Sequence, residues 1–404
     1  MAGNNYTTTA AGSLGGTAGG AGLVQKAYDK LIEFALRTQP LIRSVADKRP
    51  VALTNPGSTV TFQLYNDINR VTGTLTETAD VDASALATPK AIPVTLNEYG
   101  NAVIVTRALN LFSLADVDPA VANIIAYNMA DSVDELAQAA LDGGTNVIYG
   151  GDATSQGAIS QATTADTLSA ANIRRAVAKL RANNAVARKG SMYWAGIHPE
   201  VSHDLRSETG GAAWRDPHNY QEASNIWAGE IGSFEGAYFV ESPRLKVTGD
   251  GATVGSAKTI TAVTIASNIA GGYTATVAAT AHGFSIGDFV VLAGTSGGSP
   301  TTLNGVPFQI VTVATDSFTF NTSLSGTITV SSGTATKKTK VYRTFIAGQQ
   351  ALAEAVAEEP HVVIGPVTDK LMRHRPMGWY GVLGFARYRE EALYRIESGS
   401  SIAA

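Results

Sequence analysis

The sequence predicts an α+β protein in which an extended hairpin and a long helix precede a compact mixed middle, and an all-β module is inserted later. Polar and apolar residues alternate over 59–65, and an apolar run returns over 91–105, which predicts a strand pair. An apolar stripe at helical spacing follows over 121–140. From Val247 to Thr336, Thr, Ser, Gly and Val dominate and short strand-like runs recur.

Composition narrows the function classes. A chain of 404 residues allows two or three domains. The net charge of −4 supplies no basic field for nucleic acid, and a charged fraction of 16% fits a surface covered by partners or a Ser/Thr/Gly-rich β protein. The absence of cysteine excludes disulfides, thiolate metal sites and cysteine nucleophiles. We expect no membrane-spanning helix and no signal peptide, and we interpret residues 1–22 as a flexible arm.

The first predicted helix covers residues 22–36, and Pro40 ends it. The hairpin follows, and its tip, residues 66–89, is rich in Thr, Ala and Asp with nothing to form a core. Because ordering the backbone costs about 1–2 kcal/mol per residue, such an arm is either disordered or laid across another molecule. The tip carboxylates have three open interpretations, namely a solvated tip, a cation site, or intersubunit ion pairs: Glu77, Asp80 and Asp82.

Capping signals place the helices of the middle region. Asp116 to Pro119 opens the long helix and Gly143-Gly144 closes it, for a length of roughly 36 Å at 1.5 Å per residue. Ser169 caps a second helix. Its cations are candidates for weak contacts with DNA phosphates or with another subunit, against the simpler interpretation of a solvated helix face: Arg174, Arg175, Lys179 and Arg181. Short strands are expected at 192–197 and 237–241, with an irregular segment at 205–228.

Three further patterns have structural explanations that we prefer to functional ones. His198 and His203 are five apart with Pro199 between His198 and Glu200, so they do not match a zinc-protease helix. Residues 249–259 resemble a phosphate loop only faintly, and we expect a flexible linker there. The closing aromatic run predicts a buried strand rather than a base-stacking platform: Trp379, Tyr380, Phe385 and Tyr388. We therefore expect no catalytic residue, no cofactor and no metal.

The order of elements resembles the major capsid proteins of tailed bacteriophages, which have the Hong Kong 97-type fold. Within that group the chain is most similar to the family typified by the major capsid protein of phage N-four. The similarity covers roughly residues 20–246 and 341–398. It is carried by motifs along the whole chain: Gly57–Phe62 with Glu98–Val103, Asp118–Asp142, Tyr193–Glu200, Gly229–Gly236, Val240–Ser242, Gly378–Gly384 and Leu393–Glu397. The module at 247–340 departs from the family, and its motif Ala281–Asp288 with Leu303–Gly305 is similar to small β modules of other phage structural proteins.

The resemblance implies a division of the chain into six segments. These are an N-terminal arm and helix (1–50), an extended loop with peripheral-domain strands (51–110), a spine helix (111–150), an axial domain (151–246), the inserted all-β domain (247–340) and return strands (341–404). It implies hexamers and pentamers of one chain that tile an icosahedral shell around double-stranded DNA. A virion protein of this kind is assembled in the host cytoplasm with a portal protein and, since no fused scaffolding domain is expected, a separate scaffolding protein. DNA would be held without sequence preference, and no membrane is involved. The alternative is a phage tail or surface-binding protein whose working part is the β module.

Overall fold

A computed structural model of the protein describes most of the chain. It covers residues 40–50, 59–65, 88–112, 117–161, 166–208, 230–268, 272–299, 303–366, 371 and 373–402, with single positions between 68 and 86. The helix expected at 22–36 lies outside the described residues. The chain forms two compact units, unit 1 (residues 1–37, 100–129 and 360–380) and unit 2 (38–99, 130–359 and 381–404).

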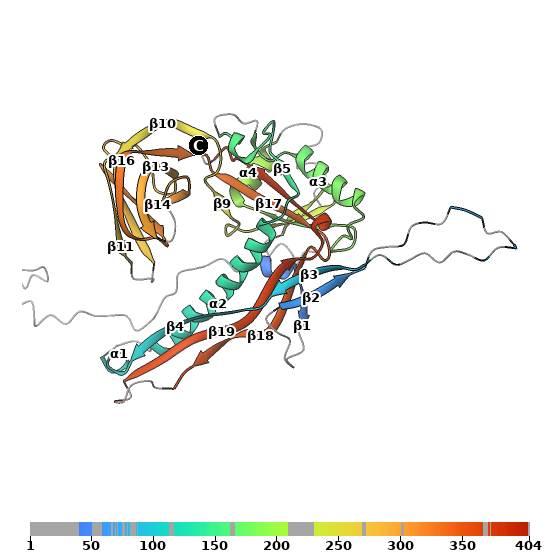
Figure 1. Ribbon diagram of the computed structural model, residues 1–404, viewed down its shortest axis with the longest axis horizontal. Helices are drawn as coiled ribbons and strands as arrows, with labels where there is room; N and C mark the ends of the chain where they lie inside the picture. The colour runs from blue at the N-terminus through green and yellow to red at the C-terminus, as the bar shows by residue number, and fades with distance from the viewer. Residues whose placement is uncertain are drawn as a thin grey trace, which may run out of the picture. The chain divides into compact units, whose positions relative to one another are not determined.

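A four-stranded sheet has the order β1-β18-β19-β4, and β1 is parallel to β18. Its strands are β1 (Ala46–Pro50), β18 (Leu352–Ile364), β19 (His374–Arg387) and β4 (Asn97–Thr106) (Figure 1). The prediction of one long return strand over 91–105 is wrong, because the strand is interrupted at Leu96. Among the described strands, β3 (Lys90–Thr95) pairs with β2 (Thr59–Leu64) alone, whereas β4 belongs to the four-stranded sheet. Alternation predicts a strand but does not identify its partner.

The long helix is confirmed as α2 (Val117–Asp142), which follows the short α1 (Arg107–Phe112). Its acidic N-cap lies outside the described residues. Ile125 and Val133 of the expected stripe are buried, but towards the C-terminal end Ala137 and Leu141 are buried rather than Leu136 and Ala140. The buried face in that part is therefore shifted by one position from the expected one. No helix of the described part of the chain is long and apolar enough to cross a membrane.

A second sheet, in unit 2, has the order β5-β20-β17-β6-β8-β7, and β9 pairs with β17. Its strands are β5 (Val147–Tyr149), β20 (Leu393–Ser398), β17 (Val341–Ala347), β6 (Tyr193–Ile197), β8 (Ala237–Glu241), β7 (Glu230–Phe234) and β9 (Val247–Thr248). The strands expected at 192–197 and 237–241 are confirmed as β6 and β8. The sheet shares one core with two helices, α3 (Ala170–Ala182) and α4 (Pro199–Ser207). Ser169 caps α3 as expected, accepting a hydrogen bond from the Asn172 amide at 3.4 Å.

Helix α4 is a correction to the sequence analysis, which began an irregular segment at 205 and saw no helix after His198. Pro199 occupies the first turn, where its missing N–H costs nothing, and His198 is the N-cap. The imidazole Nδ1 accepts the Glu200 amide at 3.3 Å. Since histidine is an uncommon cap, the usual Ser/Thr/Asp/Asn signal was absent. Residues 209–229 of the expected irregular segment lie outside the described residues.

The third sheet has seven strands in the order β10-β16-β13-β14-β15-β12-β11 and surrounds its own core. The strands are β10 (Thr253–Ile260), β16 (Ser325–Lys338), β13 (Phe289–Ser299), β14 (Pro307–Ala314), β15 (Ser317–Thr322), β12 (Tyr273–Ala278) and β11 (Ala262–Ser267). The flexible linker expected at 249–259 is wrong. β9 pairs with β17 and β10 with β16, so the incoming and outgoing chains are hydrogen-bonded to each other.

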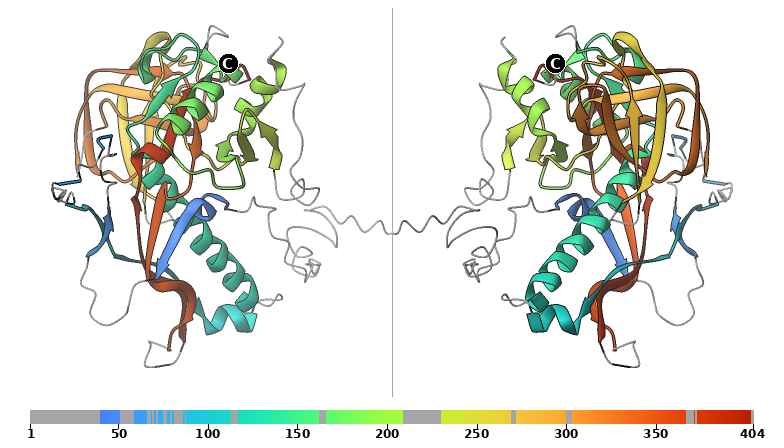
Figure 2. Two further views of the ribbon diagram at one scale, coloured as in Figure 1. Left: turned by 90° about the vertical axis from the view of Figure 1, so that its right-hand side faces the viewer. Right: turned by 90° about the vertical axis from the view of Figure 1, so that its left-hand side faces the viewer.

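The closing aromatic run lies in β19 and the residue after it, and Trp379 and Tyr388 are 5% and 6% exposed. Their burial confirms a packed strand. Short 3₁₀ turns complete the fold at Ile42–Val45, Gln156–Ala158 and Glu390–Ala392. Figure 2 shows β1, in blue, beside the long orange-red strands of the same sheet.

Candidate assembly surfaces

The β2–β3 hairpin is packed only at its base. Ile92 and Val94 are 8% and 1% exposed, and the ring of Phe62 meets Tyr388 edge-on at 6.3 Å. Beyond the base, Tyr65, Ile68 and Leu86 are 67%, 57% and 71% exposed. Every described position from Ile68 to Thr88 is exposed. The hairpin therefore presents large apolar side chains that its own subunit does not cover.

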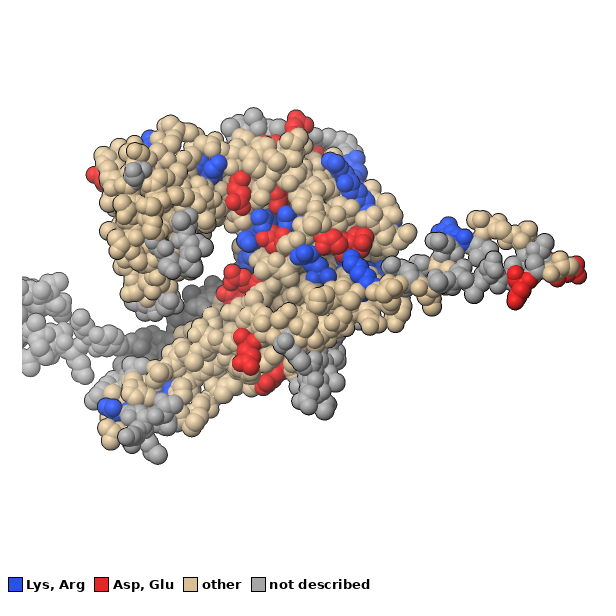
Figure 3. All heavy atoms as spheres, in the orientation of Figure 1, with Lys and Arg blue, Asp and Glu red and all other residues tan. Residues whose placement is uncertain are grey.

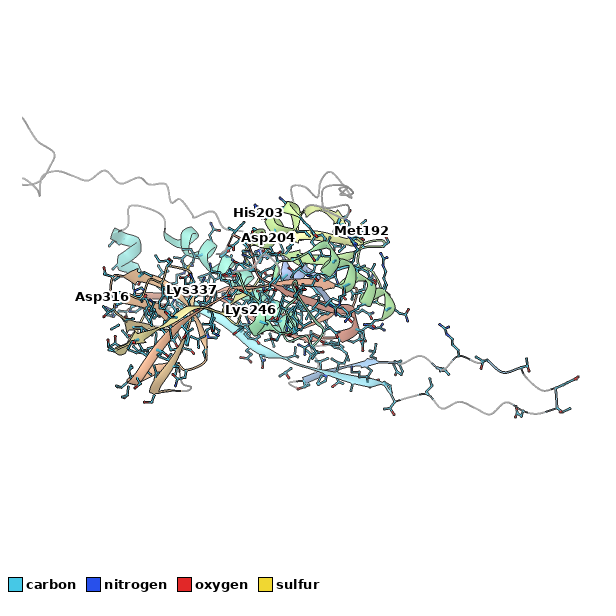
Figure 4. The ribbon with its side chains drawn as sticks, turned by 90° about the horizontal axis from the view of Figure 1, so that it is seen from above. Met192, His203, Asp204, Lys246, Asp316 and Lys337 are labelled. Atoms are coloured by element: carbon cyan, nitrogen blue, oxygen red, sulfur yellow. The ribbon has the colours of Figure 1, made fainter. Side chains whose placement is uncertain are left out.

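The acidic tip is only partly described. Glu77 and Asp80 are exposed, and Asp82 lies outside the described residues. Among the described residues, no group of three His, Asp or Glu side chains could hold a metal ion. The two histidines singled out by spacing are held separately, since His198 caps α4 while the side chain of His203 is 60% exposed beside Asp204 (Figure 4).

The four α3 cations lie on the exposed side of the helix, and Figure 3 shows Lys and Arg side chains gathered over it. Arg174 pairs with Glu235 at 3.0 Å, and the Lys179 ammonium lies 5.8 Å from the ring centre of Tyr394. Arg175 and Arg181 are exposed. Half of this cationic face is therefore engaged within the subunit.

A cavity of about 500 Å³ in unit 2 is lined by charged groups of both signs. Arg244 forms an ion pair with Asp131, and Lys246 (Figure 4) pairs with Asp142 at 3.0 Å. The Tyr342 hydroxyl donates to Glu200. Charged side chains that line the cavity are therefore already engaged in ion pairs and hydrogen bonds within the subunit.

Two titratable groups in this wall are shifted toward their neutral forms. Burial lowers the pKa of His198, against the opposing effect of nearby Glu200. Burial raises the pKa of Asp134, although the backbone amide of Arg43 donates to its carboxylate at 2.8 Å. Both shifts follow from burial of a charge rather than from an arrangement of acid and base around a reacting group.

A buried ion network that sequence reasoning missed holds the C-terminal end of α2. Asp142 pairs with Arg343 of β17 and lies 3.5 Å from Arg395 of β20, which itself reaches Glu397 at 2.9 Å. Arg395 also donates to the carbonyl oxygen of Asp142. A carboxylate at a helix C-terminus is unfavourable with the helix dipole, so these cations offset a local conflict. The sequence feature that could have indicated this network is Asp142, an acidic residue at the C-terminal end of the helix.

The comparisons agree with this geometry. A model of the phage capsid protein family matches residues 19–400. The capsid of Ralstonia phage GP4 is similar with a TM-score of 0.57 and 14% identity, over 96% of this chain and 98% of that chain. The capsid of cyanophage P-SCSP1u has a TM-score of 0.57 and 12% identity, over 94% of each chain. The head of Helicobacter pylori phage KHP40 has a TM-score of 0.53 and 10% identity, over 94% of this chain and 96% of that chain. No curated protein matches the sequence.

The fold therefore defines a Hong Kong 97-type capsid protein, as the sequence resemblance predicts. With the family model matching nearly its full length, the chain belongs to the phage capsid protein family. It is a major capsid protein, a structural component of the virion.

Proposed function

We propose that this chain tiles an icosahedral shell as hexamers and pentamers around double-stranded DNA, and that each β2–β3 hairpin rests on an adjacent subunit. The observation that carries the proposal is the hairpin's exposure, since Tyr65, Ile68 and Leu86 are each more than half exposed. A two-stranded ribbon is marginally stable in water by itself, and large apolar side chains exposed on it are typical of an interaction surface. A neighbouring subunit supplies the missing surface many times over in a shell.

Within that shell we assign the six segments named from sequence, and place the module at 247–340 on the outer face. Its few charges support this place, because a DNA-facing surface would gain from many cations. The acidic tip is proposed to form ion pairs on the neighbour, and the exposed α3 cations to make weak contacts with DNA or another subunit. Portal and scaffolding functions belong to separate proteins, assembly takes place in the host cytoplasm, and the chain is not an enzyme.

Deleting the tip from Thr72 to Ala87 tests the hairpin. The variant should remain a soluble subunit and fail to form closed shells when wild-type protein forms them with its scaffold, as seen by negative-stain electron microscopy. A matched control replaces the same residues with a Gly/Ser segment of equal length. It separates the effect of shortening the hairpin from the effect of removing its side chains. Normal particles from the deletion would rule the proposal out.

The tail or surface-binding alternative makes a different particle. Rings or trimers of wild-type protein, in place of closed shells, would support it.

A charge-reversal variant carrying Glu77→Lys and Asp80→Lys tests the proposed ion pairs separately. We expect it to lower the yield of shells while leaving the unassembled subunit folded.

A further inference from the structure

The first described residues of the chain, 40–50, cross several parts of unit 2 and are called the strap here. They comprise the 3₁₀ turn Ile42–Val45 and strand β1. Ile42 and Val45 are 2% and 1% exposed and share a core with Leu141 and Leu352. β1 runs parallel to β18, with Ala46 opposite Leu352 and Pro50 opposite Val356. The strap is therefore a packed part of unit 2.

Charges fasten the strap to β18. The Arg43 guanidinium lies 2.6 Å from Glu354 and 2.8 Å from Glu359, and Lys48 reaches Glu359 at 3.1 Å. The two carboxylates differ in exposure, since the Glu354 side chain is 0% exposed and that of Glu359 is 56% exposed. Within the described part of the chain, Arg43 is the only cation paired with Glu354.

Hydrogen bonds tie the strap to three further elements. The Arg43 amide donates to Asp134 of α2 at 2.8 Å. The Gln350 amide donates to Asp47 at 2.7 Å, and the Arg188 guanidinium donates to the Ser44 carbonyl at 3.0 Å. Contacts from α2, from the β17–β18 turn and from the segment after α3 thus converge on a short stretch of chain.

We propose that the strap is an ionic latch that holds residues 40–50 against β18, with Arg43 as its positioning residue. Among the described residues, none lies within hydrogen-bonding distance of the other oxygen of Glu354. Withdrawing the strap would leave a fully buried carboxylate without a counter-charge, which is strongly unfavourable. The strap and β18 are therefore coupled, and the strap keeps the same position on unit 2 as long as the Arg43–Glu354 pair is formed. Only the consequence for assembly rests on the function proposed above.

Hydrogen exchange of the unassembled full-length subunit tests the latch. Arg43→Met keeps a long side chain and removes the charge, and we expect the amides of residues 42–48 to exchange at least tenfold faster while those of α3 are unchanged. Lys48→Met is the matched control within the strap, because Lys48 forms its ion pair with the exposed Glu359, and the substitution should change exchange less than threefold. Unchanged strap exchange in Arg43→Met overturns the proposal.

A rescue separates the latch from ordinary loss of packing. Adding Glu354→Gln removes the buried charge, so the double variant should recover at least half of the lost protection, on a logarithmic scale. No recovery in the double variant also overturns the proposal. If Arg43→Met does not fold, Arg43→Lys keeps the charge but loses the forked geometry, and its strap exchange should lie above that of the wild type. Wild-type exchange in that variant contradicts the latch.

The consequence for assembly has its own measurement. Arg43→Met subunits with a loosened strap should form shells with a lower yield of regular particles than Lys48→Met subunits. Regular particles from a variant whose strap exchanges freely would show that assembly does not require the latch. This outcome is distinct from failure of the shell proposal itself, in which the wild type forms no shells.

Discussion

At the scale of single residues, glycines decide where strands approach one another. A Cβ on Gly384 of β19 would lie 2.2 Å from the carbonyl oxygen of Thr95, at the end of β3. In the same sheet, a Cβ on Gly100 or Gly378 would lie 2.7 Å from a backbone oxygen of the neighbouring strand. Backbone cannot move aside as a flexible side chain can, so only glycine fits these positions.

Gly384→Ala should therefore lower the free energy of unfolding by about 1–3 kcal/mol, as overpacking does. Denaturant titration of the unassembled subunit measures the change. The matched control is Gly73→Ala, where an added Cβ meets nothing within 4 Å. The control should stay within about 0.5 kcal/mol of the wild type. Equal effects of the two substitutions would contradict the close approach of β19 and β3.

The ionisation of Glu390 makes the stability of the fold depend on pH. Burial opposes its charge, but hydrogen bonds from Thr145 and the ion pair with Arg387 at 2.9 Å outweigh burial and lower its pKa. Because the folded pKa lies below the unfolded one, the carboxylate stabilises the fold above about pH 4.3, the usual glutamate value. That stabilisation is lost as the pH falls through the lowered pKa.

The stability difference between wild type and Glu390→Gln should therefore shrink as the pH is lowered from about 6 to about 3. Urea denaturation at each pH measures it. Thr145→Val, which removes the hydroxyl donor to Glu390 and keeps the backbone amide donor, should show the same trend with a smaller amplitude. A difference that stays constant over this range would show that the carboxylate is not held in its charged form.

At the scale of elements, the module at 247–340 differs most from the expectation of a tethered domain. The incoming and outgoing chains pair from Val247–Tyr342 through Thr253–Lys338. Ala252 also donates to the Ile159 carbonyl at 2.8 Å, and Thr339 is 0% exposed. A paired double connection restricts motion far more than two independent linkers would.

Residues 247–340 expressed alone should still fold, because the described part of the module has its own core of buried side chains, which include Phe318 and Phe320. We expect a dispersed amide spectrum of β type by nuclear magnetic resonance. Phe320→Ala should abolish it, since loss of a buried aromatic costs about 3–5 kcal/mol, comparable with the stability of a small domain. Thr312→Ala, at an exposed position of β14, is the matched control and should retain the spectrum. A collapsed spectrum for the unsubstituted module would contradict independent folding.

At the scale of the whole molecule, charge limits affinity for the genome. The chain carries a net charge of −4, and Arg174 and Lys179 of the α3 face already have partners. Each phosphate neutralised contributes about −0.9 to the log–log salt slope, so few contacts give weak binding at physiological salt. In the proposed shell, DNA would be confined by the closed wall rather than by affinity.

Gel-shift titration of the unassembled subunit should show weak binding without sequence preference. Arg175→Gln combined with Arg181→Gln should reduce the residual binding and its salt slope by about one to two, if α3 faces DNA. The matched control is Lys258→Gln, outside the α3 face. Tight, sequence-selective binding would argue for a nucleic-acid-binding function instead.

Much of the fold could be read from the sequence, for a physical reason. Periodicity and caps are local, so α2 and the Ser169 cap of α3 followed from neighbouring residues alone. The module was visible because a composition change extends over its whole length. The order of these elements was enough to predict the capsid class that the family model supports.

Only the tertiary structure decided which distant segments pair. The chain continues from β3 into β4 with only Leu96 between, yet the two strands belong to different sheets. Arg43 and Glu354 are 311 residues apart, and no local pattern relates them. Asp142 finds its cations on β17 and β20 in the same way. Such ion pairs depend on burial and on partners brought together by folding, and neither is encoded within a short window of sequence.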